Sequence, residues 1–302
     1  MHILATEGLT KRFPTVTALD QLTVSVGPGV TGLVGANGAG KSTLIKIMLG
    51  LLPPSAGSAR VLDLDVTEQG PQIRRRVGYM PEHDCLPPDV SATEFVVHLA
   101  QMSGLPRTAA RERAADVLRH VGLAEERYRA IGGYSTGMKQ RVKLAQALVH
   151  DPKLIFLDEP TNGLDPRGRD EMLMLIRRIG TEFGISVLVT SHLLGELERI
   201  CDHVVVIDAG RLLRSSAIAE FTQSTQTVTV EVEEGTQPLA ERLAQLGQTV
   251  TPHGRLLLVK VLGPETFDVI RDATVDLDLC LIRLEQGRHR IEDVFREEAT
   301  NV

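Results

Sequence analysis

The sequence predicts an α/β protein built on a mostly parallel sheet, and three observations support this fold class. Short apolar segments alternate with segments of helical periodicity through the first 220 residues, as in "VTGLVG" before "KSTLIKIMLGLL" and "KLIFLD" before "GRDEMLMLIRRIG". The pattern becomes wholly helical between about residues 90 and 150, and it changes again after about residue 219. Buried strands interleaved with helices are typical of parallel sheets covered by helices.

The predicted elements follow in order along the chain. "HILATEGL" and "LTVSV" are strand-like patterns near the N-terminus, while "ISVLVTS" precedes the helical "LLGELERI" and "HVVVID" supplies a further strand. Between residues 90 and 150, "SATEFVVHLAQMSGL", "RTAARERAADVLRHVGL" and "GMKQRVKLAQALV" place apolar residues at helical spacing. We therefore expect a helical insert in this part of the α/β domain.

A small α+β domain is predicted at residues 221–302, after a larger domain at residues 1–220. The strand-like segments "TVTVEVEE", "RLLLVKVLG" and "LCLIRLEQG" alternate with the helical segments "PLAERLAQLG" and "ETFDVIRDA". "RIEDVFREEAT" is predicted to be a closing helix, and the polar stretch "TQSTQT" is interpreted as the linker.

Composition and charge narrow the class of protein. The formal charge of −6 comes from residues 221–302, which hold 8 basic and 14 acidic side chains (8 − 14 = −6), so the first 220 residues are neutral. Neither part has the basic character of a nucleic-acid binder. The longest apolar runs fall far short of the ~20 residues of a membrane-spanning helix. No secretory signal is recognisable, so we expect the chain to stay in the cytoplasm.

Cysteine usage fits the same compartment. Cys85, Cys201 and Cys280 are odd in number, far apart and without metal-ligand spacing, as expected in a reducing environment. Because free cysteine behaves as a small buried hydrophobe, all three are interpreted as structural.

The segment "GANGAGKST" is the first functional motif. It fits G-x-x-x-x-G-K-[ST], follows an apolar strand and opens a helix, which is the context of a phosphate-binding loop (P-loop). Its glycines let backbone N–H groups close around phosphate oxygens, and the helix N-terminus adds positive potential. Lys41 is expected to reach the β- and γ-phosphates, and Ser42 to ligate Mg²⁺. The predicted nucleotide-binding residues are Gly35, Ala36, Asn37, Gly38, Ala39, Gly40, Lys41, Ser42 and Thr43.

Two carboxylates and a histidine follow later strands. Asp158 and Glu159 end the buried strand in "KLIFLDEPTNGLDP", and His192 ends the next strand in "TSH". Asp158 suits Mg²⁺, directly or through water. Glu159 is expected to polarise a water for in-line attack on the γ-phosphate, and His192 to hold Glu159 and that water in geometry.

The stretch "YSTGMKQR" predicts a second anion-binding helix start. Ser135 lies near the expected N-cap and is followed by the conformationally permissive Gly137, so a hydroxyl and backbone N–H groups converge on an anion. Because the P-loop already cradles one triphosphate, this second site calls for the nucleotide of a partner.

The motifs in this order resemble those of the ABC ATPases. "YSTGM" is similar to that family's signature, usually written LSGGQ, and it lies between a P-loop and the segments "FLDEP", "GLDP" and "TSH". The resemblance covers about residues 1–220. It implies a P-loop core with a mostly parallel sheet, an N-terminal antiparallel β part and a helical subdomain.

Family membership also implies a head-to-tail dimer, of two identical or two related copies, with ATP and Mg²⁺ as cofactors. Each ATP would lie between the P-loop of one copy and Ser135, Thr136 and Gly137 of the other. Asp165, in "GLDP", would communicate between the sites. Phe13 would stack on adenine, with Val16 lining the base.

The chain departs from the family pattern at two places. The signature has Thr136 for its second glycine and Met138 for its glutamine. In "YMPEHDCL" the usual glutamine is replaced by Glu82, which can ligate Mg²⁺ but cannot donate a hydrogen bond as an amide does.

The resemblance implies an ATPase that energises transport through a separate permease at the cytoplasmic face of the plasma membrane. Residues His83 to Val97 are the expected permease surface. The ending "RIEDVFREEA" resembles ATPases of ABC-2-type exporters, which favours export of a drug, antibiotic, lipid or similar amphiphile. An importer ATPase is the alternative. An ABC ATPase acting on the ribosome or on nucleic acid is less favoured, because the chain has one P-loop, no coiled coil and no basic surface.

Overall fold

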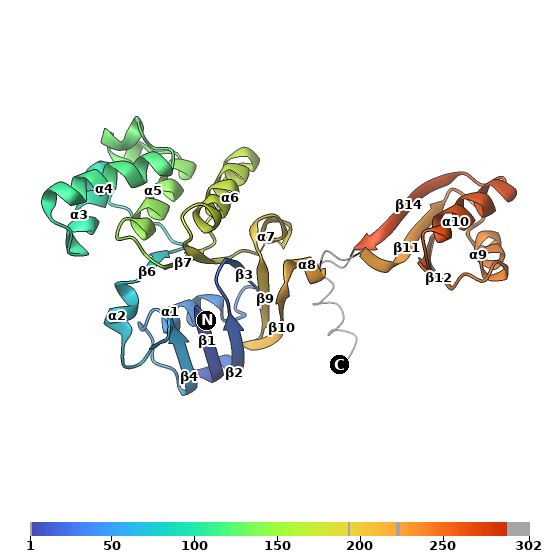
Figure 1. Ribbon diagram of the computed structural model, residues 1–302, viewed down its shortest axis with the longest axis horizontal. Helices are drawn as coiled ribbons and strands as arrows, with labels where there is room; N and C mark the ends of the chain where they lie inside the picture. Colours follow the sequence, from blue (N-terminus) through green and yellow to red (C-terminus); the bar gives the residue numbers. More distant parts are fainter. Residues whose placement is uncertain (1, 193, 222–223, 289–302) are drawn as a thin grey trace. The chain divides into compact units, whose positions relative to one another are not determined.

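The computed structural model describes residues 2–192, 194–221 and 224–288. The chain divides into two compact units, Met1–Ile218 and Ala219–Val302, and each is described by itself. The first unit runs from blue to yellow-orange in Figure 1, and the second is orange and red.

A six-stranded sheet forms the centre of the first unit. Five neighbouring strands are parallel, and one edge strand, β10, pairs antiparallel with β9. Every residue of β3, β7 and β8 is buried, which explains their continuous apolar sequences. The predicted mostly parallel sheet is therefore confirmed. In spatial order the strands are β10 (Arg211–Ala217), β9 (His203–Asp208), β3 (Val30–Val34), β8 (Ser186–Thr190), β7 (Leu154–Asp158) and β6 (Val77–Met80).

A second, antiparallel sheet carries the N-terminal strands. Its order is β2 (Thr17–Val26), β1 (Leu4–Arg12), β4 (Ala56–Val61) and β5 (Leu64–Asp65). Leu9 and Leu22 from this sheet share one hydrophobic core with Ile45 of α1 and with Leu33 and Phe156 of the central sheet. Helix α1 is thus held between two sheets, which fixes the direction of its N-terminus.

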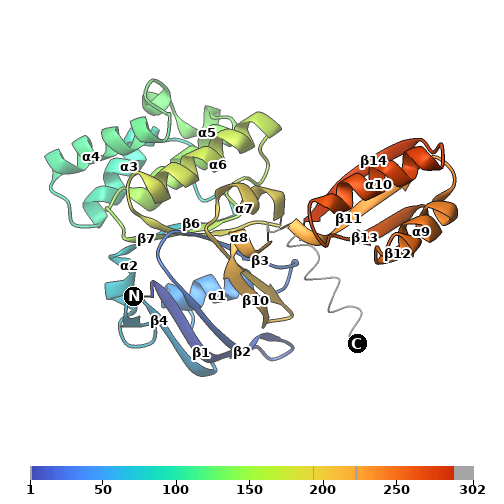
Figure 2. The ribbon, with the colours of Figure 1, turned by 45° about the vertical axis from the view of Figure 1, so that its right-hand side comes forward.

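The helices of the first unit surround the central sheet. In Figures 1 and 2, α1 lies on one side of the sheet and α6 on the other. Between β6 and β7 the chain forms the helices α3, α4 and α5 after a loop at residues 81–91, and Ser91 and Glu94 form a capping box at the start of α3. The elements are α1 (Lys41–Met48), α2 (Gly70–Arg74), α3 (Ala92–Met102), α4 (Arg107–His120), α5 (Thr136–Leu148), α6 (Pro166–Thr181) and α7 (Leu194–Ile200), with short 3₁₀ turns at Glu126–Tyr128 and Ile131–Gly133. The short helix α8 (Ile218–Phe221) begins at the last residue of this unit.

The second unit is an antiparallel α+β fold with its own core. Its sheet has the order β12 (Val250–His253), β13 (Leu256–Lys260), β11 (Ser224–Val232) and β14 (Leu281–Arg288). Helices α9 (Thr236–Gln245) and α10 (Glu265–Asp276) pack against each other and contribute Leu239, Leu243 and Ile270 to the core.

The structure bears on three predictions, for the proposed linker, the closing helix and the cysteines. The interpretation of "TQSTQT" as a linker is wrong for Ser224–Thr227, which belong to β11 because the strand pairs with both β13 and β14. The segment "RIEDVFREEAT" lies outside the described residues. The cysteine interpretation holds only for Cys201, whose thiol is buried. Cys85 and Cys280 are exposed, because one lies in a loop and the other at the start of an edge strand.

None of the helices in the described part of the chain has both the length and the apolar character needed to cross a membrane.

Candidate functional site

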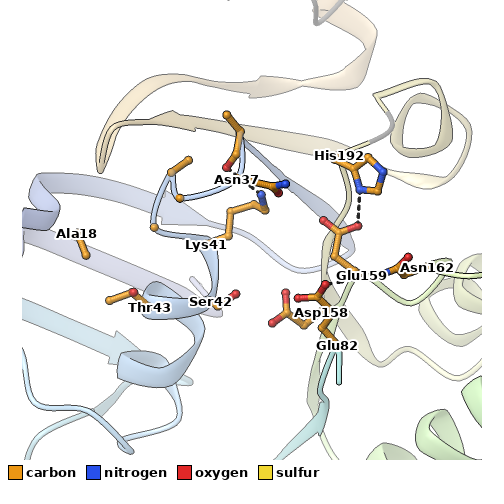
Figure 3. A pocket seen from close by; sticks show the side chains of 14 residues that line it. Ala18, Asn37, Lys41, Ser42, Thr43, Glu82, Asp158, Glu159, Asn162 and His192 are labelled. Atoms are coloured by element: carbon orange, nitrogen blue, oxygen red, sulfur yellow. Dashed lines mark hydrogen bonds and ion pairs between the residues drawn. The ribbon is translucent and has the colours of Figure 1, made fainter. Parts of the chain in front are cut away.

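A cavity of about 490 Å³ lies at the carboxyl edge of the central sheet. The loop between β3 and α1 forms one wall, and residues that follow β6, β7 and β8 form the other, as Figure 3 shows. The carboxyl ends of neighbouring parallel strands meet at one edge of the sheet, where α/β proteins bind ligands. The residues around it are Ala18, Ala36, Asn37, Gly38, Ala39, Gly40, Lys41, Ser42, Thr43, Glu82, Asp158, Glu159, Asn162 and His192.

The loop before α1 has the geometry of a phosphate cradle. Gly40 has φ 103° at the N-cap of α1, and a Cβ there would lie 2.4 Å from the Ala18 carbonyl oxygen, so only glycine fits. Lys41 is 8% exposed, and its Nζ donates to the carbonyl oxygens of Gly35 at 2.7 Å and Ala36 at 3.2 Å. Because α1 begins at Lys41, the first-turn N–H groups have no helical acceptor and can serve an anion.

Asp158 and Glu159 face this loop across the cavity (Figure 3). The Thr190 hydroxyl donates to Asp158 Oδ1 at 2.8 Å and accepts from the Glu159 N–H at 2.9 Å, so strand β8 fixes both residues. Glu159 has φ 50°, a left-handed conformation that few non-glycine residues adopt. His192 Nδ1 lies 2.9 Å from Glu159 Oε2. A buried carboxylate next to an imidazole can accept a proton from water.

Glu82 borders the same cavity, beyond the end of β6. The Asn162 amide donates to Glu82 Oε1 at 3.4 Å, and Lys143 Nζ donates to the Glu82 carbonyl oxygen at 2.8 Å. The local negative charge also acts on Tyr79. Burial, with further contributions from Asp158 and nearby acidic groups, raises the pKa of Tyr79 to about 12.

The oxygen ligands on this cavity fit a magnesium ion. Ser42 supplies a hydroxyl, and Glu82 and Asp158 supply carboxylates. Mg²⁺ prefers hard oxygen ligands and is usually held by one or two carboxylates together with water and substrate phosphates. The described residues contain no group of three or more His, Cys, Asp or Glu side chains arranged to hold a metal, so a dedicated metal cage is absent there.

A second cavity, of about 520 Å³, lies between the starts of α5 and α6. Ser135 is the N-cap of α5 and accepts from the Met138 N–H at 3.3 Å, as the sequence predicts. Asp165 is the N-cap of α6 and accepts from the Gly168 N–H at 2.9 Å. The cavity is lined by Ser135, Thr136, Gly137, Met138, Arg141, Gly163, Leu164, Asp165, Arg167, Gly168, Glu171 and Met172.

The structure thus gathers most of the predicted residues into two places. The P-loop residues Ala36–Thr43 line the first cavity together with Glu82, Asp158, Glu159 and His192, while Gly35 accepts the hydrogen bond that braces Lys41. Ser135, Thr136, Gly137 and Asp165 line the second cavity. Phe13 and Val16 are exposed at the turn between β1 and β2 and are not among the residues that line either cavity.

Besides Ala18, which also lines the cavity, sequence reasoning missed three residues that make polar contacts at the first site. Asn162 lines the cavity, Thr190 holds the two carboxylates, and Lys143 holds the Glu82 loop. Asn162 lies within the segment "LDEPTNGLDP" and Thr190 within "TSH", so both motifs carried a usable signal. Lys143 had none, because a lysine in an amphipathic helix is ordinarily a solvated residue.

Comparisons with known proteins agree with this geometry. The sequence model of the ABC transporter family matches residues 19–162. The chain is 36% identical to the daunorubicin/doxorubicin resistance ATP-binding protein DrrA of Streptomyces peucetius, over 82% of this chain and 76% of the relative. It is 38% identical to the bacitracin transport ATP-binding protein BcrA of Bacillus licheniformis, over 70% and 68%. It is 33% identical to the Nod factor export ATP-binding protein I of Ralstonia nicotianae, over 97% and 92%.

Solved structures show the same fold. The protein cbiO1 of Clostridium perfringens, part of the ABC transporter complex cbiONQ, matches with a TM-score of 0.68 and 29% identity, over 82% of this chain and 97% of that one. An ATP-binding cassette solved as a post-hydrolysis dimer with ADP and Pi matches with a TM-score of 0.66, over 71% and 98%. At 23% identity the latter match concerns the fold alone.

The fold and the first cavity define a P-loop nucleotide-binding protein. With the family match and these relatives, the chain belongs to the ATP-binding proteins of ABC transporters. It is an ATPase, which confirms the expected enzyme class.

Proposed function

We propose that the first cavity hydrolyses ATP and that the residues around it divide the work as their geometry suggests. The amides of the loop and Lys41 hold the β- and γ-phosphates, where their positive potential offsets charge that develops during transfer. Ser42, Asp158 and Glu82 would hold Mg²⁺, which neutralises phosphate charge when bound. Residues 1–220 would form the nucleotide-binding domain and residues 221–302 an accessory domain.

The Glu159–His192 pair is the observation that carries this proposal. A water oxygen attacks the γ-phosphorus while the bond to the β–γ bridging oxygen breaks, which yields ADP and inorganic phosphate. Glu159 accepts a proton from the attacking water. His192, 2.9 Å from that carboxylate, keeps it directed at the water and the γ-phosphate. The backbone of Glu159 is held independently by Thr190, so the side chain has little freedom to turn away.

The second cavity is the basis for a dimer. Ser135, Thr136 and Gly137 present a helix start to an anion but have no catalytic carboxylate–histidine pair beside them. They would close over the triphosphate held by the P-loop of a second copy, with Asp165 linking the two sites. Opening and closing of this dimer would drive a separate permease that contacts residues His83 to Val97 at the cytoplasmic face of the plasma membrane.

The relatives favour export as the direction of transport. The names of two of them refer to daunorubicin/doxorubicin resistance and to Nod factor export. These names refer to amphiphilic or antibiotic molecules, so we propose an amphiphile or antibiotic as the class of substrate for this chain.

The variant Glu159→Gln tests the assignment. Loss of the proton acceptor is expected to lower ATP turnover about 1,000-fold while ATP binding is kept, because the amide retains the size of the side chain. Size-exclusion chromatography with ATP is expected to show a trapped dimer. His192→Ala is the matched control and should lose turnover less severely. Unchanged hydrolysis by Glu159→Gln would remove the proposed role of this residue.

A further inference from the structure

Glu82 stands where the family resemblance predicts an amide, and a buried lysine holds its main chain. Lys143, on α5, is only 3% exposed, and its Nζ donates to the Glu82 carbonyl oxygen at 2.8 Å. Lysine is almost never buried so completely unless its charge has partners. Burial lowers the pKa of the Lys143 ammonium, while the charges of Cys85, Asp84, Glu82 and Asp158 act to raise it.

Helix α5 holds the same loop by two further contacts. Gln140 Nε2 donates to the Asn162 carbonyl oxygen at 3.0 Å, and the Asn162 amide in turn donates to Glu82 Oε1. Lys139, one turn before Lys143, places its Nζ 3.5 Å from Asp84 Oδ2. Lys139 and Lys143 share one helix face because they are four residues apart. Both the main chain and the side chain of Glu82 therefore depend on α5.

The position of α5 itself is tightly defined. A Cβ at Gly78 would lie 1.9 Å from the Ala147 carbonyl oxygen, so the helix backbone contacts the backbone of β6 directly. This contact is one turn beyond Lys143, and β6 leads into the loop that carries Glu82. The packing of these two backbones therefore sets how close α5 lies to the Glu82 loop. Lys143 then connects the helix to the loop through its hydrogen bond with the Glu82 carbonyl oxygen.

We propose that Lys143 is a positioning residue for ATP hydrolysis, which fixes residues 82–85 against α5 so that the Glu82 carboxylate stays in the cavity beside Asp158. The inference rests on the proposed function, in which Glu82 takes part in the nucleotide site. A side chain without a donor at position 143, such as methionine, leaves the Glu82 carbonyl without the hydrogen bond from Lys143.

The kinetic test compares variants of the full chain. Lys143→Met is expected to lower kcat about tenfold and to change the KM for ATP less than about twofold, because the loop is displaced while the P-loop is intact. Lys143→Arg, which keeps a charged donor, is expected to recover turnover to within about threefold of the original chain. Lys153→Met is the control. It removes an exposed lysine just before β7 and is expected to change kcat less than about twofold.

A double variant separates positioning from general stability. If Lys143 acts through Glu82, then adding Lys143→Met to the Glu82→Ala variant should cause almost no additional loss of kcat. Equal losses with and without Glu82 would overturn the proposal. A chain that hydrolyses no ATP before any substitution would instead contradict the proposed function, so the two failures are distinguishable.

Cys85 offers a readout that does not depend on turnover. It is exposed and lies in the same loop, whereas Cys201 is buried, so Cys280→Ser leaves Cys85 as the reactive thiol for a nitroxide spin label. We expect Lys143→Met to increase the mobility of the label in the electron paramagnetic resonance spectrum, and Lys143→Arg to restore it. Identical spectra with lysine and methionine at this position would also overturn the proposal. Should Lys143→Met not fold, Lys143→Gln, which is polar but uncharged and one bond shorter than lysine, gives the same comparison.

Discussion

The two cavities of the first unit are similar in size and both lie at helix starts, but their charged residues differ. Both lie at the start of a helix, and their volumes are about 490 and 520 Å³. The first holds the buried cation Lys41 and, facing it, the buried carboxylates Asp158 and Glu159. In the second, Arg141 and Arg167 are both paired with Glu171, at 2.8 and 3.1 Å.

This difference indicates unequal tasks for the two cavities. The first combines the loop and Lys41, proposed to bind phosphate, with Glu159, the proposed proton acceptor, and His192 beside it. In the second, the charges of Arg141 and Arg167 are offset by Glu171, which pairs with both, and by Asp165 in the same lining, so the helix start and the Ser135 hydroxyl remain as the anion-binding features. We therefore expect the first cavity to bind ATP within one copy, and the second to contribute only after the first cavity of a partner is filled.

The largest effect is expected from Lys41→Ala, which attacks the first cavity alone. It removes the cation expected at the phosphates and the brace on the carbonyl oxygens of Gly35 and Ala36, so ATP affinity should fall at least about 100-fold. Equilibrium binding of a fluorescent ATP analogue measures this loss. Ser135→Ala is the control and should leave the affinity of the monomer unchanged. Comparable losses in both variants would mean that the two cavities do not differ in this way.

A smaller and more selective effect is expected from Ser135→Arg. The larger side chain fills the second cavity, so ATP affinity should stay within about twofold while the ATP-dependent dimer is lost, because the partner's triphosphate no longer fits beneath α5. Light scattering with ATP, in the Glu159→Gln background, reports the dimer directly. A dimer that persists in the arginine variant would exclude the second cavity from the contact between copies.

The smallest effect concerns Tyr79, whose pKa is raised by burial and by carboxylates next to the first cavity. Because the pKa of Tyr79 is raised to about 12, its neutral form is favoured in the folded chain. The neutral Tyr79 therefore contributes to the free energy of unfolding. This contribution is complete below the ordinary tyrosine pKa of about 10 and is lost as the pH rises through about 12. Tyr79→Phe should therefore remove the tyrosine ionisation near pH 12 from an absorbance titration at 295 nm. The exposed Tyr128→Phe is the control and should keep that step.

The sequence predicts the central sheet and the two helix starts well, for local reasons. Continuous apolar runs such as "KLIFLD" bury both faces of a strand, and Ser135 is a strong N-cap residue, so each feature is encoded within a few neighbouring residues. The same holds for the spacing of Gly35, Lys41 and Ser42 before α1. The family membership inferred from these motifs is confirmed by the comparisons.

The features that escaped prediction depend on contacts between distant residues. Lys143 and Glu82 are 61 residues apart, and Asn162 and Glu82 are 80 apart, so no local pattern connects them. The short strands β4 and β6 were not predicted, because their sequences, "AGSARV" and "VGYM", have weak alternation. Cys85 is exposed because it lies in the loop after β6, and the preference of a free thiol for burial does not reveal that position.

The left-handed backbone conformation of Glu159 lowers the stability of the fold, but it belongs to the residue that is proposed to accept the proton. Holding a non-glycine residue in this conformation costs on the order of 1–3 kcal/mol, which Thr190 and His192 must offset locally. Glycine here would relax the backbone but remove the carboxylate proposed to accept the proton, so on this proposal the more stable chain would be inactive. Selection for thermal robustness alone would tend to erase the chemistry at this position.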